Sequence, residues 1–95
     1  MFDVVDNELG IVGYLWVGTD ASDDPSSWWI WDFLIEDEFR GRGFGKSAML
    51  LAENYARSQG AATLGLNVFG FNTTARRLYE SVGYETTSLK MRKTL

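Results

Sequence analysis

The amino-acid sequence predicts an α+β domain with a three-layer α/β arrangement, in which a mixed, mostly antiparallel sheet contains one parallel β-α-β crossover. Three observations support this fold class. Short β-prone runs fill the first third of the chain, a glycine-rich turn separates a strand from a helix, and a second strand-helix pair follows. The predicted order of elements is β-β-β-α-β-α-β, and the sequence has no internal repeat.

The first two predicted strands form a hairpin. Residues 2–5 and 11–17 are rich in β-branched and aromatic residues, and the segment 6–10 between them, Asp-Asn-Glu-Leu-Gly, has the composition of a turn. Residues 18–27 are polar and contain the single proline, so we expect a loop there.

The third predicted strand spans residues 28–35. Almost every residue in it is apolar on both alternating faces, which is typical of a central strand covered on both sides. Asp32 is the exception. A carboxylate among tryptophan and aliphatic side chains is costly to bury alone, so Asp32 is expected to have either a structural partner or a chemical task.

A helix of about four turns is predicted from Phe44 onward, and Gly60 is expected to end it. Its apolar positions share one face, namely Phe44, Ala48, Leu51, Ala52 and Tyr55. Residues 63–69 predict a second central strand, parallel to 28–35 because a helix connects the two.

A second helix is predicted after Asn72, which is a favourable N-cap residue, and Gly83 is expected to end it. Its inner face carries Ala75, Leu78, Tyr79 and Val82. Residues 84–95 are predicted to close the chain as one or two strands.

The composition restricts the chemistry. Ninety-five residues fit one small domain, and a net charge of −4 argues against nucleic-acid binding, which depends on clustered Lys and Arg. Without Cys or His, the chain has no thiolate nucleophile and no imidazole base, and we expect no metal site. Neither a membrane-spanning run nor a signal peptide is recognisable, so we expect a cytoplasmic protein that does not bind membranes.

The most informative segment is residues 40–46, Arg-Gly-Arg-Gly-Phe-Gly-Lys, between a predicted strand and a predicted helix. Glycines let the backbone approach a ligand closely, and a helix start offers unpaired N–H groups, so this turn is predicted to bind phosphate. The nucleoside-triphosphate P-loop requires glycine where Arg40 stands, and the dinucleotide-binding fingerprint requires glycine where Lys46 stands. Neither pattern fits.

Two longer segments resemble signatures of the GNAT superfamily of N-acetyltransferases. Residues 33–45 resemble its fourth strand and pyrophosphate loop, with Arg40, Gly43 and Gly45 at the family spacing. Residues 72–84 resemble its second signature, Asn-x-x-Ala-x-x-Leu-Tyr-x-x-x-Gly-Phe/Tyr. The resemblance covers residues 2–95. It implies direct transfer of an acetyl group from acetyl-CoA to an amine acceptor, which is a small molecule or a protein amine.

The resemblance also implies a coenzyme site. Backbone amides of the turn would hold the pyrophosphate, the strand would pair with the pantetheine arm, and Asn72 would contact that arm. The implied residues are Phe33, Leu34, Ile35, Arg40, Gly41, Arg42, Gly43, Phe44, Gly45, Lys46, Asn72 and Tyr79. The structural alternatives are solvated basic side chains for Arg42 and Lys46, core side chains for the strand, and a plain N-cap for Asn72.

For catalysis, the resemblance implies that Tyr79 donates a proton to the departing thiolate, and the alternative is a tyrosine of the core. Relatives often carry Glu where this sequence has Asn67, which leaves the general base unassigned among Asp32, Glu36 and ordered water. A structural ion pair is the alternative for Asp32. The tryptophans at 16, 28, 29 and 31 are expected in the core or along an acceptor pocket.

Full family members begin with a strand and two helices before the hairpin, and this sequence has no residues for them, so we expect an N-terminally truncated domain. An apolar face or edge of the sheet would then be uncovered, which motivates the hypothesis of a homodimer. The alternative functions are a non-catalytic acetyl-CoA-binding sensor or interaction module, and another kind of nucleotide-phosphate module.

Overall fold

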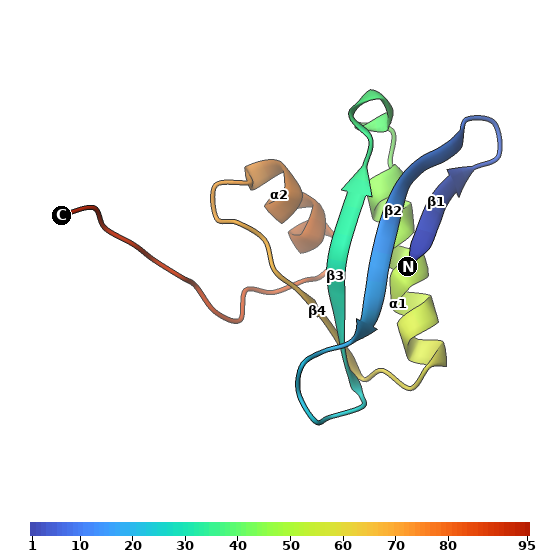
Figure 1. Ribbon diagram of the computed structural model, residues 1–95. Helices are drawn as coiled ribbons and strands as arrows, with labels where there is room; N and C mark the ends of the chain where they lie inside the picture. The colour runs from blue at the N-terminus through green and yellow to red at the C-terminus, as the bar shows by residue number, and fades with distance from the viewer.

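The computed structural model describes all of residues 1–95 (Figure 1). A sheet of four strands in the order β1-β2-β3-β4 carries two helices, which confirms the predicted α+β class. The strands are β1 (Phe2–Asp6), β2 (Gly10–Thr19), β3 (Ser27–Ile35) and β4 (Thr63–Leu66). A short 3-10 helix, η1 (Asp37–Phe39), leads into α1 (Phe44–Ser58), and α2 (Thr73–Ser81) follows β4.

The strand directions agree with the predictions. β1 and β3 are both antiparallel to β2, whereas β4 runs parallel to β3. The β1-β2 turn forms because the carboxylate of Asp6 accepts hydrogen bonds from the N–H groups of Glu8 and Leu9, both at 3.0 Å.

The core lies between the sheet and α1, which crosses behind β2 and β3 in Figure 1. Met49 and Ala52 of α1 pack against Leu15, Val17 and Ile30 of these strands. The predicted inner face of this helix was wrong in part, because Leu51 is 67% exposed and Met49 is buried in its place. Alanines at 48, 52 and 56 let the helix lie close to the sheet along one row, and that row turns Leu51 toward solvent.

The end of α1 and the start of α2 lie where the sequence signals predict them. Gly60 takes a φ of +94° just after α1, where the N–H of Ala61 bonds back to the carbonyl of Ala56 at 2.9 Å. At the start of α2, Asn72 Oδ1 accepts a hydrogen bond from the N–H of Ala75 at 3.2 Å, so the predicted N-cap is confirmed. Neither helix combines the length and the apolar character needed to cross a lipid bilayer.

The prediction that β3 is covered on both faces was wrong. β3 is central in strand order, but no helix covers the face opposite α1, and Trp31 and Asp32 are exposed there.

Two predicted strands differ from the structure. β4 ends at Leu66 instead of residue 69, since the chain turns away from β3 and the rings of Phe69 and Phe71 stack on each other outside the sheet, 5.4 Å apart. Residues 84–95 form no strand and extend away from the sheet (Figure 1). A β-prone segment becomes a strand only when a neighbouring edge pairs with its backbone, and here none does.

Candidate functional site

The parallel strands β3 and β4 diverge in the middle of the sheet. Their pairing runs only from Ser27–Thr63 to Ile30–Leu66, while β3 continues to Ile35. A hollow of about 200 Å³ opens where they separate, which we call the β3/β4 hollow. Its lining includes Trp31, Asp32, Phe33, Asn67, Asn72 and Tyr79.

The backbone of β3 faces this divergence at alternate residues. The carbonyl of Leu34 points toward β2, because a Cβ atom on Gly13 would lie only 2.0 Å from it. The carbonyl of Ile35 points the other way and accepts a hydrogen bond from Arg40 Nε at 3.0 Å. Since backbone directions alternate along a strand, the backbone groups of Phe33 and Ile35 point toward the divergence and those of Leu34 do not. The N–H of Phe33 is engaged there by Asp32 Oδ1 at 2.9 Å.

The glycine-rich turn follows the end of β3. Gly41 and Gly43 take φ values of +77° and +83°, a conformation that favours glycine, and α1 begins directly afterwards. The helical hydrogen bonds start when the N–H of Ser47 donates to the carbonyl of Gly43 at 3.1 Å, and no side chain caps this end. The N–H groups of residues 44–46 are therefore available to an anion.

The basic residues of the turn divide into two kinds. Arg40 is held in the protein, because its guanidinium also pairs with the Asp37 carboxylate at 2.8 Å, and it thereby ties η1 to the end of β3. Arg42 and Lys46 are exposed, and neither takes part in an ion pair of the structure.

The third glycine brings the turn close to α2. A Cβ atom at position 45 would lie 3.0 Å from Leu78 Cδ2 and 4.0 Å from Phe33 Cζ. The start of α1 thus packs on the side chains of α2 and β3 with no room for a larger residue. Through this contact, the predicted phosphate-binding turn lies beside the elements that carry Phe33 and Tyr79.

Tyr79 lies on the inner face of α2, as predicted, and its half-buried side chain packs against the core cluster. Burial raises the pKa of its phenol above the usual value of 10.0, so the hydroxyl stays protonated at neutral pH. Tyr79 lines the β3/β4 hollow, and no hydrogen bond within the chain occupies its hydroxyl.

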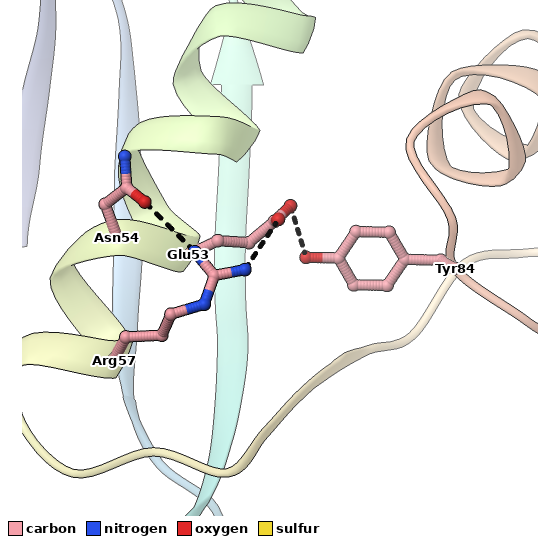
Figure 2. A network of polar contacts seen from close by, with 4 residues as sticks. All are labelled: Glu53, Asn54, Arg57 and Tyr84. Atoms are coloured by element: carbon pink, nitrogen blue, oxygen red, sulfur yellow. Dashed lines mark hydrogen bonds and ion pairs between the residues drawn. The ribbon is translucent and has the colours of Figure 1, made fainter.

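A second hollow, of about 720 Å³, lies on the other side of Tyr79, beside the free edge of β4. Figure 2 shows the polar network on its wall, in which Tyr84 Oη donates to Glu53 Oε2 at 3.3 Å. Glu53 also pairs with Arg57 at 3.8 Å, and the Tyr84 ring meets the Tyr79 ring edge-on at 6.1 Å. Burial and the Glu53 carboxylate raise the pKa of Tyr84. Sequence reasoning missed Glu53, because nothing local relates it to a tyrosine 31 positions away.

Asp32 has a partner that is not a cation. Its Oδ2 accepts a hydrogen bond from Tyr14 Oη at 3.0 Å, and its Oδ1 accepts one from the N–H of Phe33 at 2.9 Å. The hydrogen bond that Tyr14 donates to Asp32 is the main cause of the raised pKa of the Tyr14 phenol. No Lys or Arg pairs with Asp32, so the structural ion pair considered for it is not formed. Sequence reasoning missed Tyr14, although it shares a strand face with Trp16. Glu36 is exposed just after β3.

The four tryptophans fall into two pairs. Trp28 packs against the core cluster, and the Trp29 ring covers Gly65, where a Cβ atom would lie 2.4 Å from it. Trp16 and Trp31 instead lie on the open face with 48% and 44% exposure. The expectation of core tryptophans therefore holds for Trp28, whereas Trp29 is half-buried at the larger hollow and Trp16 and Trp31 are exposed.

Comparison with known proteins agrees with this geometry. The acetyltransferase (GNAT) family matches residues 2–84. The chain is 39% identical over 89 residues to the uncharacterized N-acetyltransferase YycN of Bacillus subtilis, covering 94% of this chain and 57% of YycN. It is 37% identical over 84 residues to the uncharacterized N-acetyltransferase YdgE of the same organism, covering 88% of this chain and 54% of YdgE.

Solved structures show the same relationship. The crystal structure of YycN from Bacillus subtilis superposes with a TM-score of 0.84 at 40% identity, covering 94% of this chain and 57% of YycN. An acetyltransferase structure from Pyrococcus furiosus gives a TM-score of 0.73 at 26% identity, covering 96% of this chain and 62% of that one. The chain thus spans a little over half the length of the relatives it matches.

Proposed function

This chain belongs to the acetyltransferase (GNAT) family, and from that premise we propose that it transfers the acetyl group of acetyl-CoA directly to an amine. The family supports acyl transfer in general. The amine acceptor follows from relatives described as N-acetyltransferases. The observation that carries the proposal is that β3 diverges from β4 beside the uncapped start of α1. One extended thioester ligand can therefore pair with the β3 backbone and bind the helix start at the same time.

In this proposal the coenzyme pyrophosphate binds the free N–H groups at residues 44–46, with additional charge from Arg42 and Lys46. The pantetheine arm then lies along β3, where β4 has left the carbonyl of Phe33 and the N–H of Ile35 unpaired, while the Phe33 N–H donates to Asp32. This arrangement directs the thioester into the β3/β4 hollow, toward Tyr79 on its opposite wall.

The reaction is a direct displacement. A neutral amine attacks the thioester carbonyl, its proton passes to Asp32, Glu36 or a water molecule, and a strand amide supports the oxyanion of the tetrahedral intermediate. The intermediate collapses by breaking the carbon–sulfur bond, and Tyr79 gives its proton to the departing thiolate. Tyr79 is then protonated again from solvent. No covalent enzyme intermediate is required, which is consistent with a chain that lacks Cys.

The proposal is tested by calorimetric titration with acetyl-CoA, combined with a thiol-release assay on a panel of amines. We expect saturable binding, turnover on at least one amine, and little competition from ATP. Saturable binding without turnover on any amine would favour the non-catalytic acetyl-CoA-binding module. Absence of binding heat at millimolar acetyl-CoA, with folded protein, would contradict the proposal as a whole.

A further inference from the structure

A β-bulge in β3 changes which residues share the open face of the sheet. Trp16 pairs with Asp32, but the next residue of β2, Val17, pairs with Ile30, so Trp31 is an extra residue in β3. Two consecutive residues of β3, Trp31 and Asp32, therefore face away from α1 together with Trp16. Bulges reorient side chains in this way and are frequent beside functional sites.

The carboxylate of Asp32 is fixed in position and has no neutralising partner. Each of its oxygens already accepts one hydrogen bond, from Tyr14 Oη or from the N–H of Phe33, which restrains the group without balancing its charge. One lone pair on each oxygen remains free. Glu36 adds a second negative charge close enough to act on Tyr14. This region of the open face therefore favours a cation.

Two indole rings flank this carboxylate. The Trp16 and Trp31 ring centroids are 6.2 Å apart. The indole N–H of Trp31 donates a hydrogen bond to the carbonyl of Thr19 at 3.1 Å. Both rings leave almost half their surface exposed. Exposed aromatic rings beside an unpaired carboxylate are the groups that bind organic cations in proteins.

We propose that the open-face cluster of Tyr14, Trp16, Trp31 and Asp32 binds a positively charged group of the acceptor, and that the acceptor is a small amine with a second positive charge. The proposal rests on the acetyltransferase function proposed above. The cluster is continuous with the reaction site, since Trp31 and Asp32 line the same hollow as Tyr79.

A second charge is required by the chemistry. The attacking nitrogen must lose its proton and its charge before it can reach the thioester. A group held by the rings and the carboxylate gains from remaining cationic. One nitrogen cannot be neutral for attack and cationic for binding at once. Diamines and related dications therefore fit the site better than monoamines do.

The first test measures cation binding alone, without acetyl-CoA. Tryptophan fluorescence is titrated with choline and with 3,3-dimethylbutan-1-ol, its uncharged carbon isostere. We expect choline to bind roughly tenfold more tightly than the isostere, a difference that Asp32→Asn should remove. Asp23→Asn, in an exposed loop, is the control and should retain the preference.

The second test measures selectivity in acetyl transfer. The kcat/KM for 1,4-diaminobutane is expected to exceed that for butylamine by roughly tenfold, and Trp16→Leu should reduce this ratio to near one. Tyr55→Leu removes an exposed aromatic ring from α1 instead and should leave the ratio unchanged. Circular dichroism and thermal melting establish that each variant is folded.

The outcomes separate this inference from the function on which it rests. Equal affinity for choline and its isostere, or equal kcat/KM for diamine and monoamine, would overturn the inference while the acetyltransferase function stands. A choline preference that depends on Asp32, together with no turnover on any amine, would support the cation site and contradict the enzyme function.

Discussion

Tyr79 and Asp32 lie on the same hollow, but the fold holds them in different ways. The ring of Tyr79 is fixed by packing against the core and Tyr84, which leaves its hydroxyl free to act. Asp32 is fixed by hydrogen bonds to its carboxylate, which leaves only part of that group available. A proton donor and an anion are thus held by independent contacts, so substitutions can separate their contributions.

Replacing Tyr79 by Phe removes the proposed proton donor while the packed ring is retained. We expect kcat to fall about a hundredfold with little change in the affinity for acetyl-CoA. Steady-state kinetics and calorimetric titration measure the two quantities, and Tyr55→Phe in α1, outside the β3/β4 hollow, is the control. Unchanged turnover would show that the thiolate takes its proton from another group.

The buried tyrosines also predict sensitivity to alkali. The pKa values of Tyr79 and Tyr84 are raised in the folded protein, so below about pH 10 both states keep these protons and the full stability is present. As the pH rises above 10, the unfolded state loses the protons first, and stability falls until the folded pKa is passed. Tyr84→Phe should lessen this fall between pH 9 and about pH 11 in urea unfolding. An identical slope in the variant would mean that Tyr84 does not contribute.

Among the elements, the turn between β3 and α1 is held in one conformation. Arg40 ties it to Ile35 and Asp37, Gly41 and Gly43 provide the left-handed backbone, and Gly45 allows contact with Leu78. Most of the basic and glycine positions in this segment therefore have structural roles. In the proposed coenzyme site, the part that binds the ligand is the backbone that they arrange.

Gly43→Asp should abolish acetyl-CoA binding, because it places a negative charge and a side chain beside the proposed pyrophosphate site. Gly60→Asp is the matched control, since Gly60 has a similar φ of +94° but lies at the other end of α1. Both variants should lose about 1 to 2 kcal/mol of stability from the left-handed backbone. Only Gly43→Asp should weaken binding by more than about a hundredfold, measured by calorimetry. Equal losses of affinity in both would show that strain, and not the site, is responsible.

At the scale of the whole molecule, apolar surface remains uncovered. Only 10 of 95 residues are buried, so the interior accommodates few of the large apolar side chains. Val5 and Ile11 of the β1-β2 hairpin are exposed, and the ring of Phe2 meets Tyr55 of α1 edge-on at 4.9 Å. Exposed apolar side chains on an edge strand favour association between chains.

We therefore predict a homodimer that involves the β1 edge. Light scattering should give about twice the chain mass at high protein concentration, and Val5→Lys should shift the equilibrium toward the monomer. Ala21→Lys, in the exposed loop after β2, adds the same charge elsewhere and should leave the dimer intact. A stable monomer of the unmodified chain at high concentration would remove this hypothesis.

Much of the fold could be predicted from local sequence signals. Asn72 as an N-cap, Gly60 as a helix end and the Arg40 to Lys46 turn each depend on the chemistry of a few neighbouring residues, and all three are found where they were expected. The last strand was not predictable in this way, because residues 84–95 have β-forming side chains but no paired edge. Leu51 was misplaced for a related reason, since helix rotation depends on how closely the alanine row approaches the sheet.

The sequence by itself determined the family, the position of the glycine-rich turn and the choice of Tyr79 as the candidate acid, because these follow from residue type and spacing along the chain. Only the tertiary structure decided how far β3 and β4 pair, that a bulge turns Trp31 and Asp32 to the same open face, and that Glu53 reaches Tyr84. The physical reason is that pairing register and contacts across the fold depend on residues distant in sequence, whose mutual fit is set when the sheet and helices pack together.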